Sequence, residues 1–171
     1  MQKTKIISRV LYYISRILAI LYLGTIVYAT ISLLSGWSNK KYGDGNFIHI
    51  LYPFTDDPFL NIDNNLHYIL FSFLLPMGLY GLFFWLTGNV FKIFYQPKLF
   101  TASGVRNLRI FYLANLILPI LSLIISSFFV PIENVIIALV VVHFVLGIFA
   151  YFLAAIFKQG LKLQNEQDLF I

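Results

Sequence analysis

The stretch VIIALVVVHFVLGIFAYFLAAIF, residues 135–157, has no charged side chain along its 23 residues. A helix rises about 1.5 Å per residue, so about 20 residues cross the roughly 30 Å of hydrocarbon in a bilayer. This stretch therefore predicts a membrane-spanning helix, and a fold for which lipid is part of the solvent.

The composition of the whole chain agrees with that prediction. Hydrophobic residues make up 60% of the 171 positions, and the mean hydropathy is +0.84. Soluble domains are about 45–50% apolar, so one water-exposed domain of this length does not hide so much apolar surface. Cysteine is absent, which excludes disulfides, thiol catalysis and cysteine-ligated metal sites.

Four apolar runs are long enough to span a bilayer. They cover residues 17–35, 66–88, 110–130 and 135–157. The sequence thus predicts an all-α, polytopic membrane protein with a single domain over residues 1–171. The remaining segments are an outer loop at 36–65, an inner loop at 89–109 and a tail at 158–171.

Charge sets the predicted orientation. Ten of the twelve basic residues lie before residue 17, between 89 and 109, or after 157. Five of the seven acids lie in 36–65 and 131–134. The positive-inside rule therefore places both termini and the 89–109 loop in the cytoplasm. The net charge of +5 follows from topology, and we expect no direct binding to nucleic acid.

Two prolines divide the middle spans. Pro76 and Pro119 lie about ten residues into their spans, near mid-membrane. Each removes a helical hydrogen bond and frees the carbonyl of the residue four back, Ser72 or Asn115. The simpler interpretation is a packing kink, and the alternative is a hinge or a small polar cavity.

His143 lies inside the fourth span. Gly147, Ala150 and Ala154 follow at spacings that place all four residues on one helix face, where small residues permit close helix packing. Ser122 is predicted at a similar depth, so it is a candidate partner for His143. A neutral histidine held by one hydrogen bond is the simpler interpretation, and a functional residue is the alternative. The candidate intramembrane polar site consists of His143, Ser122, Asn115 and Ser72.

Other chemistry finds little support in the sequence. His67 and His143 differ in depth, which disfavours haem ligation. The acids Asp56, Asp57 and Asp63 lack the spacing of a calcium loop. We find no paired intramembrane carboxylates, catalytic triad or phosphate loop, so we expect no enzyme activity, metal or cofactor.

The two longer loops carry local signals. In the outer loop, residues 42–46 (YGDGN) are turn-rich and 46–54 (NFIHILYPF) are strand-like in composition. Asp63 or Asn64 is a candidate cap for span two. We expect this loop to form a small extracytoplasmic cap or a ligand-facing surface.

In the inner loop, Pro97 is predicted to end the second helix. Thr101 is placed to cap a helix that begins near Ala102 and runs through Arg106 and Arg109 into span three. Span three should therefore begin outside the lipid.

Two segments resemble a known family. KLFTASGVRNLR (98–109) and GLKLQNEQDLFI (160–171) are similar to a bacterial integral-membrane family catalogued as domain of unknown function 2975. The shared features are a Phe-Thr cap, an Asn-x-x-Arg-type helix start and a Gly-Leu-Gln-acid-Asp-Leu ending. They fall here on Phe100, Thr101, Asn107, Leu108, Arg109, Gly160, Leu163, Gln164, Glu166, Asp168 and Leu169. The chain departs at Gly104, where an acidic or amide residue would complete a capping box.

The resemblance implies four spans, location in the bacterial cytoplasmic membrane and no catalytic residues. It also implies partnership with a small helix-turn-helix transcriptional regulator. We therefore expect a small signalling or regulatory membrane protein whose cytoplasmic face binds a partner. The alternative is a transporter or channel subunit with its site between the kinked helices.

The tail is predicted to continue helix four past the membrane, with Gly160 as a weak point. Leu161, Leu169 and Phe170 would dock near Thr101, or the same surface would receive a soluble partner. Glu166 or Asp168 would face Arg106 or Arg109. The candidate partner-binding face consists of Thr101, Arg106, Arg109, Glu166, Asp168, Leu169 and Phe170.

Overall fold

The computed structural model describes residues 2–168. Its elements, in chain order, are α1 (Gln2–Ser35), β1 (Asn39–Tyr42), β2 (Phe47–Leu51), β3 (Pro58–Asp63), a π-helical segment η1 (Tyr68–Leu74), α2 (Leu75–Tyr95), α3 (Ala102–Ser127) and α4 (Asn134–Asp168). Within this part of the chain, four helices are long and apolar enough to cross a membrane, counting η1 and α2 as one. The predicted set of four spans is therefore confirmed by length and composition.

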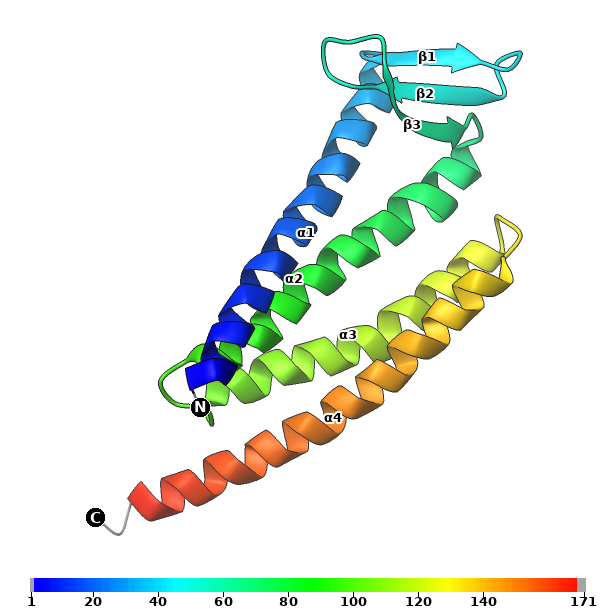
Figure 1. The fold of residues 1–171 in the computed structure, drawn as a ribbon. Helices are drawn as coiled ribbons and strands as arrows, with labels where there is room; N and C mark the ends of the chain where they lie inside the picture. Colours follow the sequence, from blue (N-terminus) through cyan, green and yellow to red (C-terminus); the bar gives the residue numbers. More distant parts are fainter. Residues whose placement is uncertain (1, 169–171) are drawn as a thin grey trace.

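The helices form two antiparallel pairs (Figure 1). α1 packs along α2, and α3 packs along α4, while α2 and α3 also contact each other. The pairs diverge toward the strands, at what we call the sheet end. The opposite end, where residues 96–101 join α2 to α3, is called the tail end. The molecule thus has the shape of a wedge.

The helices are longer than the predicted spans. α2 ends at Tyr95 and α3 begins at Ala102, in agreement with the predicted helix end at Pro97 and helix start near Ala102, so most of the 89–109 inner loop is helical. α1 begins at Gln2, and α4 passes through Gly160 without a break. Hydropathy detects only the lipid-embedded part of a helix, and charged residues such as lysine and arginine are good helix formers outside it.

The expectation of an all-α fold is wrong in the outer segment. β1, β2 and β3 form a three-stranded antiparallel sheet, in which Lys40 pairs with His49 and His49 with Asn61. The predicted turn at 42–46 joins β1 to β2. Asp44 has a φ of 55° and the flanking Gly43 and Gly45 have φ values of 58° and 85°, a region that glycine adopts without steric cost.

The sheet packs on the end of α1. Ile48, Ile50 and Ile62 are buried against Ala29, and Phe73 of η1 packs on the same cluster. The Tyr28 hydroxyl donates a hydrogen bond to the Leu51 carbonyl at 2.5 Å. The side-chain amide of Asn39 donates to the Ser32 carbonyl at 2.7 Å. These contacts fix the sheet to the α1–α2 pair.

Glycines on α2 bring α1 close. A Cβ atom at Gly81 would lie 2.8 Å from Leu23, and one at Gly88 would lie 3.4 Å from Arg16. Arg16 also donates a hydrogen bond to Asn89, and its guanidinium lies 3.8 Å from the centre of the Trp85 ring. An arginine on an aromatic face gains a cation–π attraction, so this contact helps to hold the pair near the tail end.

The two predicted helix caps have different outcomes. Thr101 is the N-cap of α3, and its side chain accepts a hydrogen bond from the Gly104 N–H at 3.1 Å, as predicted. The second predicted cap is wrong. Asn65, rather than Asp63 or Asn64, accepts from the His67 N–H at 3.0 Å. Asn64 instead donates to the Gly45 carbonyl and ties the helix start to the β1–β2 turn.

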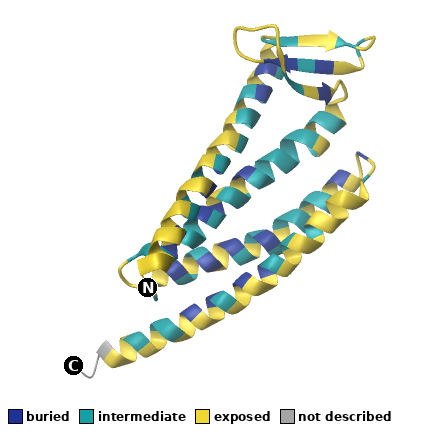
Figure 2. Ribbon diagram, in the orientation of Figure 1, coloured by how far each residue is buried: buried dark blue, intermediate teal, exposed yellow. Residues whose placement is uncertain are grey.

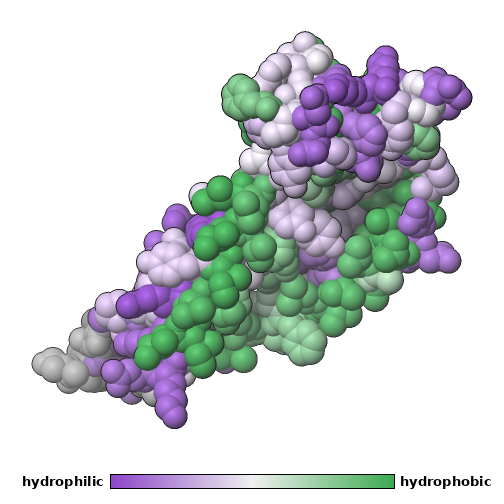
Figure 3. All heavy atoms as spheres, turned by 45° about the horizontal axis from the view of Figure 1, so that its top comes forward, coloured by the Kyte–Doolittle hydropathy of each residue, from purple (hydrophilic) through white to green (hydrophobic). Residues whose placement is uncertain are grey.

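The helices expose most of their apolar surface. In the most apolar window of each candidate span, the buried share is small: 17, 6, 17 and 11% for the four spans in chain order. Figure 2 shows exposed residues along the outward helix faces. In Figure 3 the hydrophobic atoms form a broad region over the helices, with hydrophilic residues over the sheet and at the tail end. Such a surface is stable in lipid, so the chain is a multi-pass membrane protein.

Candidate functional site: a cavity between the helix pairs

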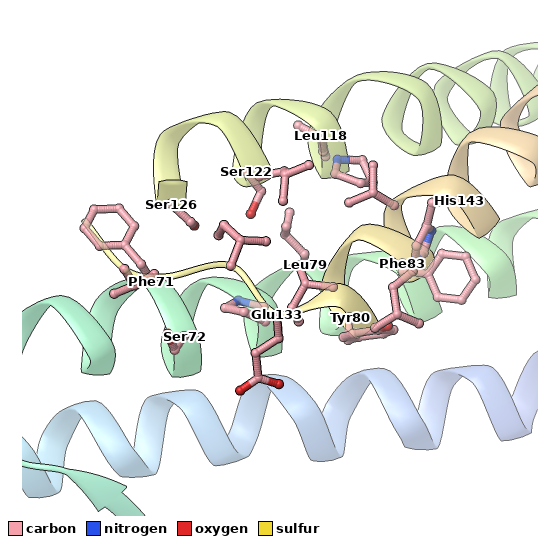
Figure 4. A pocket seen from close by; sticks show the side chains of 18 of the residues that line it. Phe71, Ser72, Leu79, Tyr80, Phe83, Leu118, Ser122, Ser126, Glu133 and His143 are labelled. Carbon is pink, nitrogen blue, oxygen red and sulfur yellow. The ribbon is translucent and has the colours of Figure 1, made fainter. Parts of the chain in front are cut away.

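A cavity of about 470 Å³ lies between η1–α2 on one side and α3–α4 on the other. Its lining includes all four residues of the predicted intramembrane polar site, which are Ser72, Asn115, Ser122 and His143. Figure 4 shows Ser72, Ser122 and His143 around this space. Side chains from three helices thus surround one space. The sequence predicted that these residues form a polar site inside the membrane, and the arrangement of the two helix pairs places them around one cavity.

Both mid-span prolines line the cavity. Pro76 is the second residue of α2, which directly follows η1. The wide turns of η1 are shown by the hydrogen bond from the Leu75 N–H to the Leu70 carbonyl, five residues back. Proline cannot donate the next hydrogen bond, and π-helical turns frequently occur at functional sites. Pro119 lies inside α3 on the facing wall. Both prolines therefore face a cavity, as in the alternative interpretation of the sequence, and its lining is mostly apolar with a few polar side chains.

His143 is bonded to Asn115. Nδ1 of His143 lies 2.7 Å from Oδ1 of Asn115, and the Asn115 amide nitrogen donates to the Phe111 carbonyl at 2.8 Å. The second bond places the amide oxygen toward the histidine. Because that oxygen only accepts, Nδ1 carries the proton in this pair. Asn115 is 3% exposed, so the bond satisfies a buried polar group.

The hydrogen-bond partner of His143 is therefore Asn115 and not the predicted Ser122. The two α3 residues are seven positions apart, or about two helical turns, and both line the cavity. The register of α3 against α4 decides which of them meets His143. Span boundaries read from hydropathy do not determine that register.

Aromatic side chains of α2 enclose the histidine ring. The ring centre of Phe83 lies 4.9 Å away at 87°, and that of Tyr80 lies 5.9 Å away at 61°. Toward the tail end, Leu86, Phe111 and Ala150 form a buried cluster. His143 thus marks the inner end of the cavity, where the helix pairs come together.

The small-residue face of α4 packs on α3, as predicted. A Cβ atom at Gly147 would lie 2.7 Å from Cγ of Leu116 and 3.3 Å from its backbone nitrogen. Ala150 and Ala154 are buried on the same face. These short side chains let the backbones approach closely enough for the bond between His143 and Asn115.

Two acidic residues stand at the sheet-end mouth of the cavity. Asp63 is the last residue of β3, and Glu133 precedes α4; both line the cavity and both are exposed. Among residues 2–168, the ion pairs are Lys40–Asp56 and Lys162–Glu166, so neither mouth carboxylate is neutralised by a bridge. The sequence suggested a ligand-facing surface for the outer loop that contains Asp63, without singling out this residue, and suggested no such role for Glu133.

An aromatic contact crosses the mouth. The ring of Phe71 in η1 stacks on that of Phe129, which follows α3, with centres 4.4 Å apart and planes 2° apart. The His67 ring also lies parallel to Phe129, at 5.5 Å. This contact limits how far the pairs separate.

The structure describes the side chains of four of the seven residues of the predicted partner-binding face. Thr101, Arg106 and Arg109 lie at the start of α3, where both arginines are exposed. Glu166 lies 3.8 Å from Lys162 of its own helix, whereas the sequence predicted that Glu166 or Asp168 would face Arg106 or Arg109. A lysine one helical turn away lies within reach of Glu166 without any tertiary contact. The side chain of Asp168, together with Leu169 and Phe170, lies outside the described residues.

The contact between α4 and the helix connection is made earlier than predicted. A Cβ atom at Gly160 would lie 2.6 Å from the Phe100 ring, and Phe157 packs edge-on against that ring with centres 5.2 Å apart. Gly160 is therefore a contact point for Phe100, whereas the sequence suggested a weak point in the helix.

Comparison with known proteins identifies the family. A family model described as a protein of unknown function (DUF2975) matches residues 43–171, which include β2, β3, the cavity and both segments that suggested the resemblance. No curated protein and no solved structure matches the chain. Because the model covers about three quarters of the sequence, the chain belongs to the DUF2975 family.

Proposed function

We propose that this protein is a small regulatory membrane protein that binds a small molecule in the cavity and signals its occupancy to a protein at the tail end. The observation that supports the proposal best is the position of the cavity. It lies between two helix pairs that diverge on one side of it and pack together on the other.

A ligand in this position acts on the angle between the pairs. Its volume sets the separation of η1 from the sheet-end half of α3. The helices are stiff, and the cluster around Leu86 and Phe111 joins the two pairs on the tail-end side of His143. A change in the separation of the helices at the mouth therefore moves their tail ends as well. A ligand shifts such an equilibrium only by binding one arrangement better than the other. The cavity supplies that difference, because its width depends on the angle.

The tail end is where a partner would sense the change. Phe100 and Phe157 link the α2–α3 connection to α4 there, and Arg106 and Arg109 are exposed beside them. The basic surface suits a protein with an acidic patch. The family resemblance suggests a helix-turn-helix transcriptional regulator. The charge pattern supports a cytoplasmic tail end and, with the resemblance, location in a bacterial cytoplasmic membrane.

Transport is the second candidate, favoured by the polar residues that line the cavity down to mid-membrane. A substrate would have to pass the buried cluster of Leu86, Phe111 and Ala150. That step requires α2 to move away from α3 and α4, so the cavity supports binding better than passage.

Spin labels on introduced cysteines test the coupling, since the chain has no cysteine of its own. One labelled pair, Leu66→Cys with Phe128→Cys, reports on the mouth, and Lys98→Cys with Lys158→Cys reports on the tail end. All four sites are exposed. The cavity is then filled with Ser122→Leu, and the matched control is Ser127→Leu, which is exposed on α3 outside the cavity.

We expect Ser122→Leu to change the distance distribution of both labelled pairs and Ser127→Leu to change neither. A change at the mouth alone would contradict signalling to the tail end. Labelling of a cysteine at Ser122 by a membrane-impermeant thiol reagent from the tail-end side would favour transport instead.

A further inference from the structure

We infer that the cavity takes molecules that join an apolar body to a cationic, ammonium-type group. The inference deepens the proposed function, because it assumes that the cavity binds a ligand and names the chemical class of that ligand.

The apolar body is suited to the walls. Aromatic and aliphatic side chains from η1, α2 and α3 dominate the lining, among them Phe71, Leu79, Phe83 and Leu118 (Figure 4). Ligand sites typically combine such walls with a few polar groups that fix orientation. Here Ser126, which is 5% exposed and carries a hydroxyl group, is one such polar residue of the lining.

The cationic group is suited to the mouth. Asp63 ends β3, in the sheet attached to the α1–α2 pair, and Glu133 directly precedes α4, so two carboxylates from opposite sides line the cavity. Within the described chain, no lysine or arginine lines the cavity, so nothing there offsets their charge. Tyr68 and Phe71, whose rings are of the kind that attracts cations, also line the cavity, and one face of Phe71 stacks on Phe129. An anion at this position would meet two like charges.

The distance between the two regions limits the size of the ligand. Glu133 and His143 are ten residues apart along α4, which corresponds to about 15 Å of helix. A molecule with its ammonium group at the carboxylates therefore reaches Asn115 and His143 with its apolar end if it is about that long. The shared chemistry fits a free cationic amphiphile as well as an aminolipid.

Two probes of the same shape and opposite charge test the inference, tetraphenylphosphonium and tetraphenylborate. Binding to the full chain in uncharged maltoside micelles is measured by titration calorimetry at about 0.1 M salt, where distant charges are screened. Triphenylphosphine oxide serves as an uncharged probe. The test variant is Asp63→Asn with Glu133→Gln. The control, Asp44→Asn with Asp57→Asn, removes the same charge from outer-segment acids that do not line the cavity.

We expect the phosphonium to bind at least tenfold more tightly than the borate. The mouth variant should lose at least tenfold in phosphonium affinity, and the control should change less than twofold. Size-exclusion profiles identical to that of the unmodified chain show that both variants are folded.

Lipid mass spectrometry then distinguishes the two sources of the ligand. An aminolipid that copurifies with the unmodified chain and is lost from the mouth variant supports the class and identifies a lipid source.

Three outcomes overturn the inference in distinguishable ways. Equal affinity for all three probes, unchanged in the mouth variant, means that the cavity binds apolar molecules without charge selection, and the proposed function stands. Tighter binding of the borate than of the phosphonium would also exclude a cationic ligand class, and the proposed function would again stand. If no probe binds, or if binding survives Ser122→Leu, the cavity is not the binding site, and the proposed function fails together with the ligand class.

Discussion

Nδ1 of His143 on α4 lies 2.7 Å from Oδ1 of Asn115 on α3, and this hydrogen bond closes the inner end of the cavity. It joins two polar side chains that would each be costly alone in a hydrocarbon environment. The bond is compatible with a packing role for His143. The same ring also faces Phe83 and Tyr80 of α2, so one residue contacts both helix pairs.

Replacing His143 tests the packing role. His143→Gln retains a donor for Asn115, so we expect stability close to that of the unmodified protein. His143→Leu leaves the Asn115 oxygen unpaired and should lower the free energy of unfolding by about 1 kcal/mol, since interhelical hydrogen bonds in membranes average about 0.6 kcal/mol. Unfolding in mixed micelles, in a double-mutant cycle with Asn115→Leu, measures the coupling. A coupling of zero would contradict this role, and a Soret band lost in His143→Gln would support haem binding.

Gly147 is predicted to tolerate no side chain. In Gly147→Ala the new Cβ would lie 2.7 Å from Leu116 Cγ, so we expect a loss of about 1–3 kcal/mol, as for an overpacked core. Gly147→Leu should disturb α3–α4 packing further, and more than His143→Gln does. Gly24→Ala is the matched control, because no atom lies within 4 Å of its added Cβ. Equal stability of the two alanine variants would exclude a close contact at Gly147.

The orientation of the chain stays a prediction from its charges. A reporter fused after Ile171, or inserted near Gln96, should read cytoplasmic, and one inserted near Asp44 should read extracytoplasmic. The position of Asp44 in the β1–β2 turn leaves room for an insertion. An external signal from the Ile171 fusion would require an odd number of spans and would exclude this topology.

Removal of residues 163–171 tests the tail. The deletion spares Gly160 and its contact with Phe100, so membrane insertion and helix packing should persist. We expect lower stability in detergent or loss of capture of a cytoplasmic partner, because burial of each large apolar side chain contributes about 1.5–3 kcal/mol. Hydrogen exchange of the intact tail reports its protection directly. Exchange as fast as in a free peptide, with and without cytosolic extract, would contradict docking.

The outer sheet should loosen in acid. The hydrogen bond from Lys40, and its positive charge, hold the pKa of Asp56 below the usual 3.8. A lowered pKa in the folded state stabilises the fold above pH 3.8, and this contribution is lost as the pH falls through the folded-state value. The Tyr52 amide donates to the Asp57 carbonyl, and its protection factor, which is the exchange rate of an unfolded peptide at the same pH divided by the observed rate, should therefore fall below about pH 4. Lys40→Met should weaken that loss of protection and Lys41→Met should not; equal profiles in the two variants would exclude the Lys40–Asp56 pair as its cause.

The sequence determined the features that depend on local chemistry and on the thickness of a bilayer. Four uncharged runs predicted four spans, because any helix that crosses hydrocarbon needs about 20 apolar residues. Thr101 predicted the start of α3, since a cap acts within one helical turn. The small residues after His143 predicted a packing face from helical spacing alone. The strand-like stretch in the outer loop also appeared in the composition, but three short strands become a sheet only when they pair with one another.

Tertiary structure decided which of these residues meet. Asn115 and Ser122 share one face of α3, and only the register against α4 selected Asn115 for His143. Asp63 and Glu133 are 70 positions apart in the chain and reach one opening because the two helix pairs diverge there. Glu166 found its partner within its own helix. The cavity lies between two helix pairs, and packing near Leu86 and Phe111 sets the angle between them. Hydrophobic periodicity in a single sequence reveals helices and their apolar faces, but it does not reveal which faces of two helices meet.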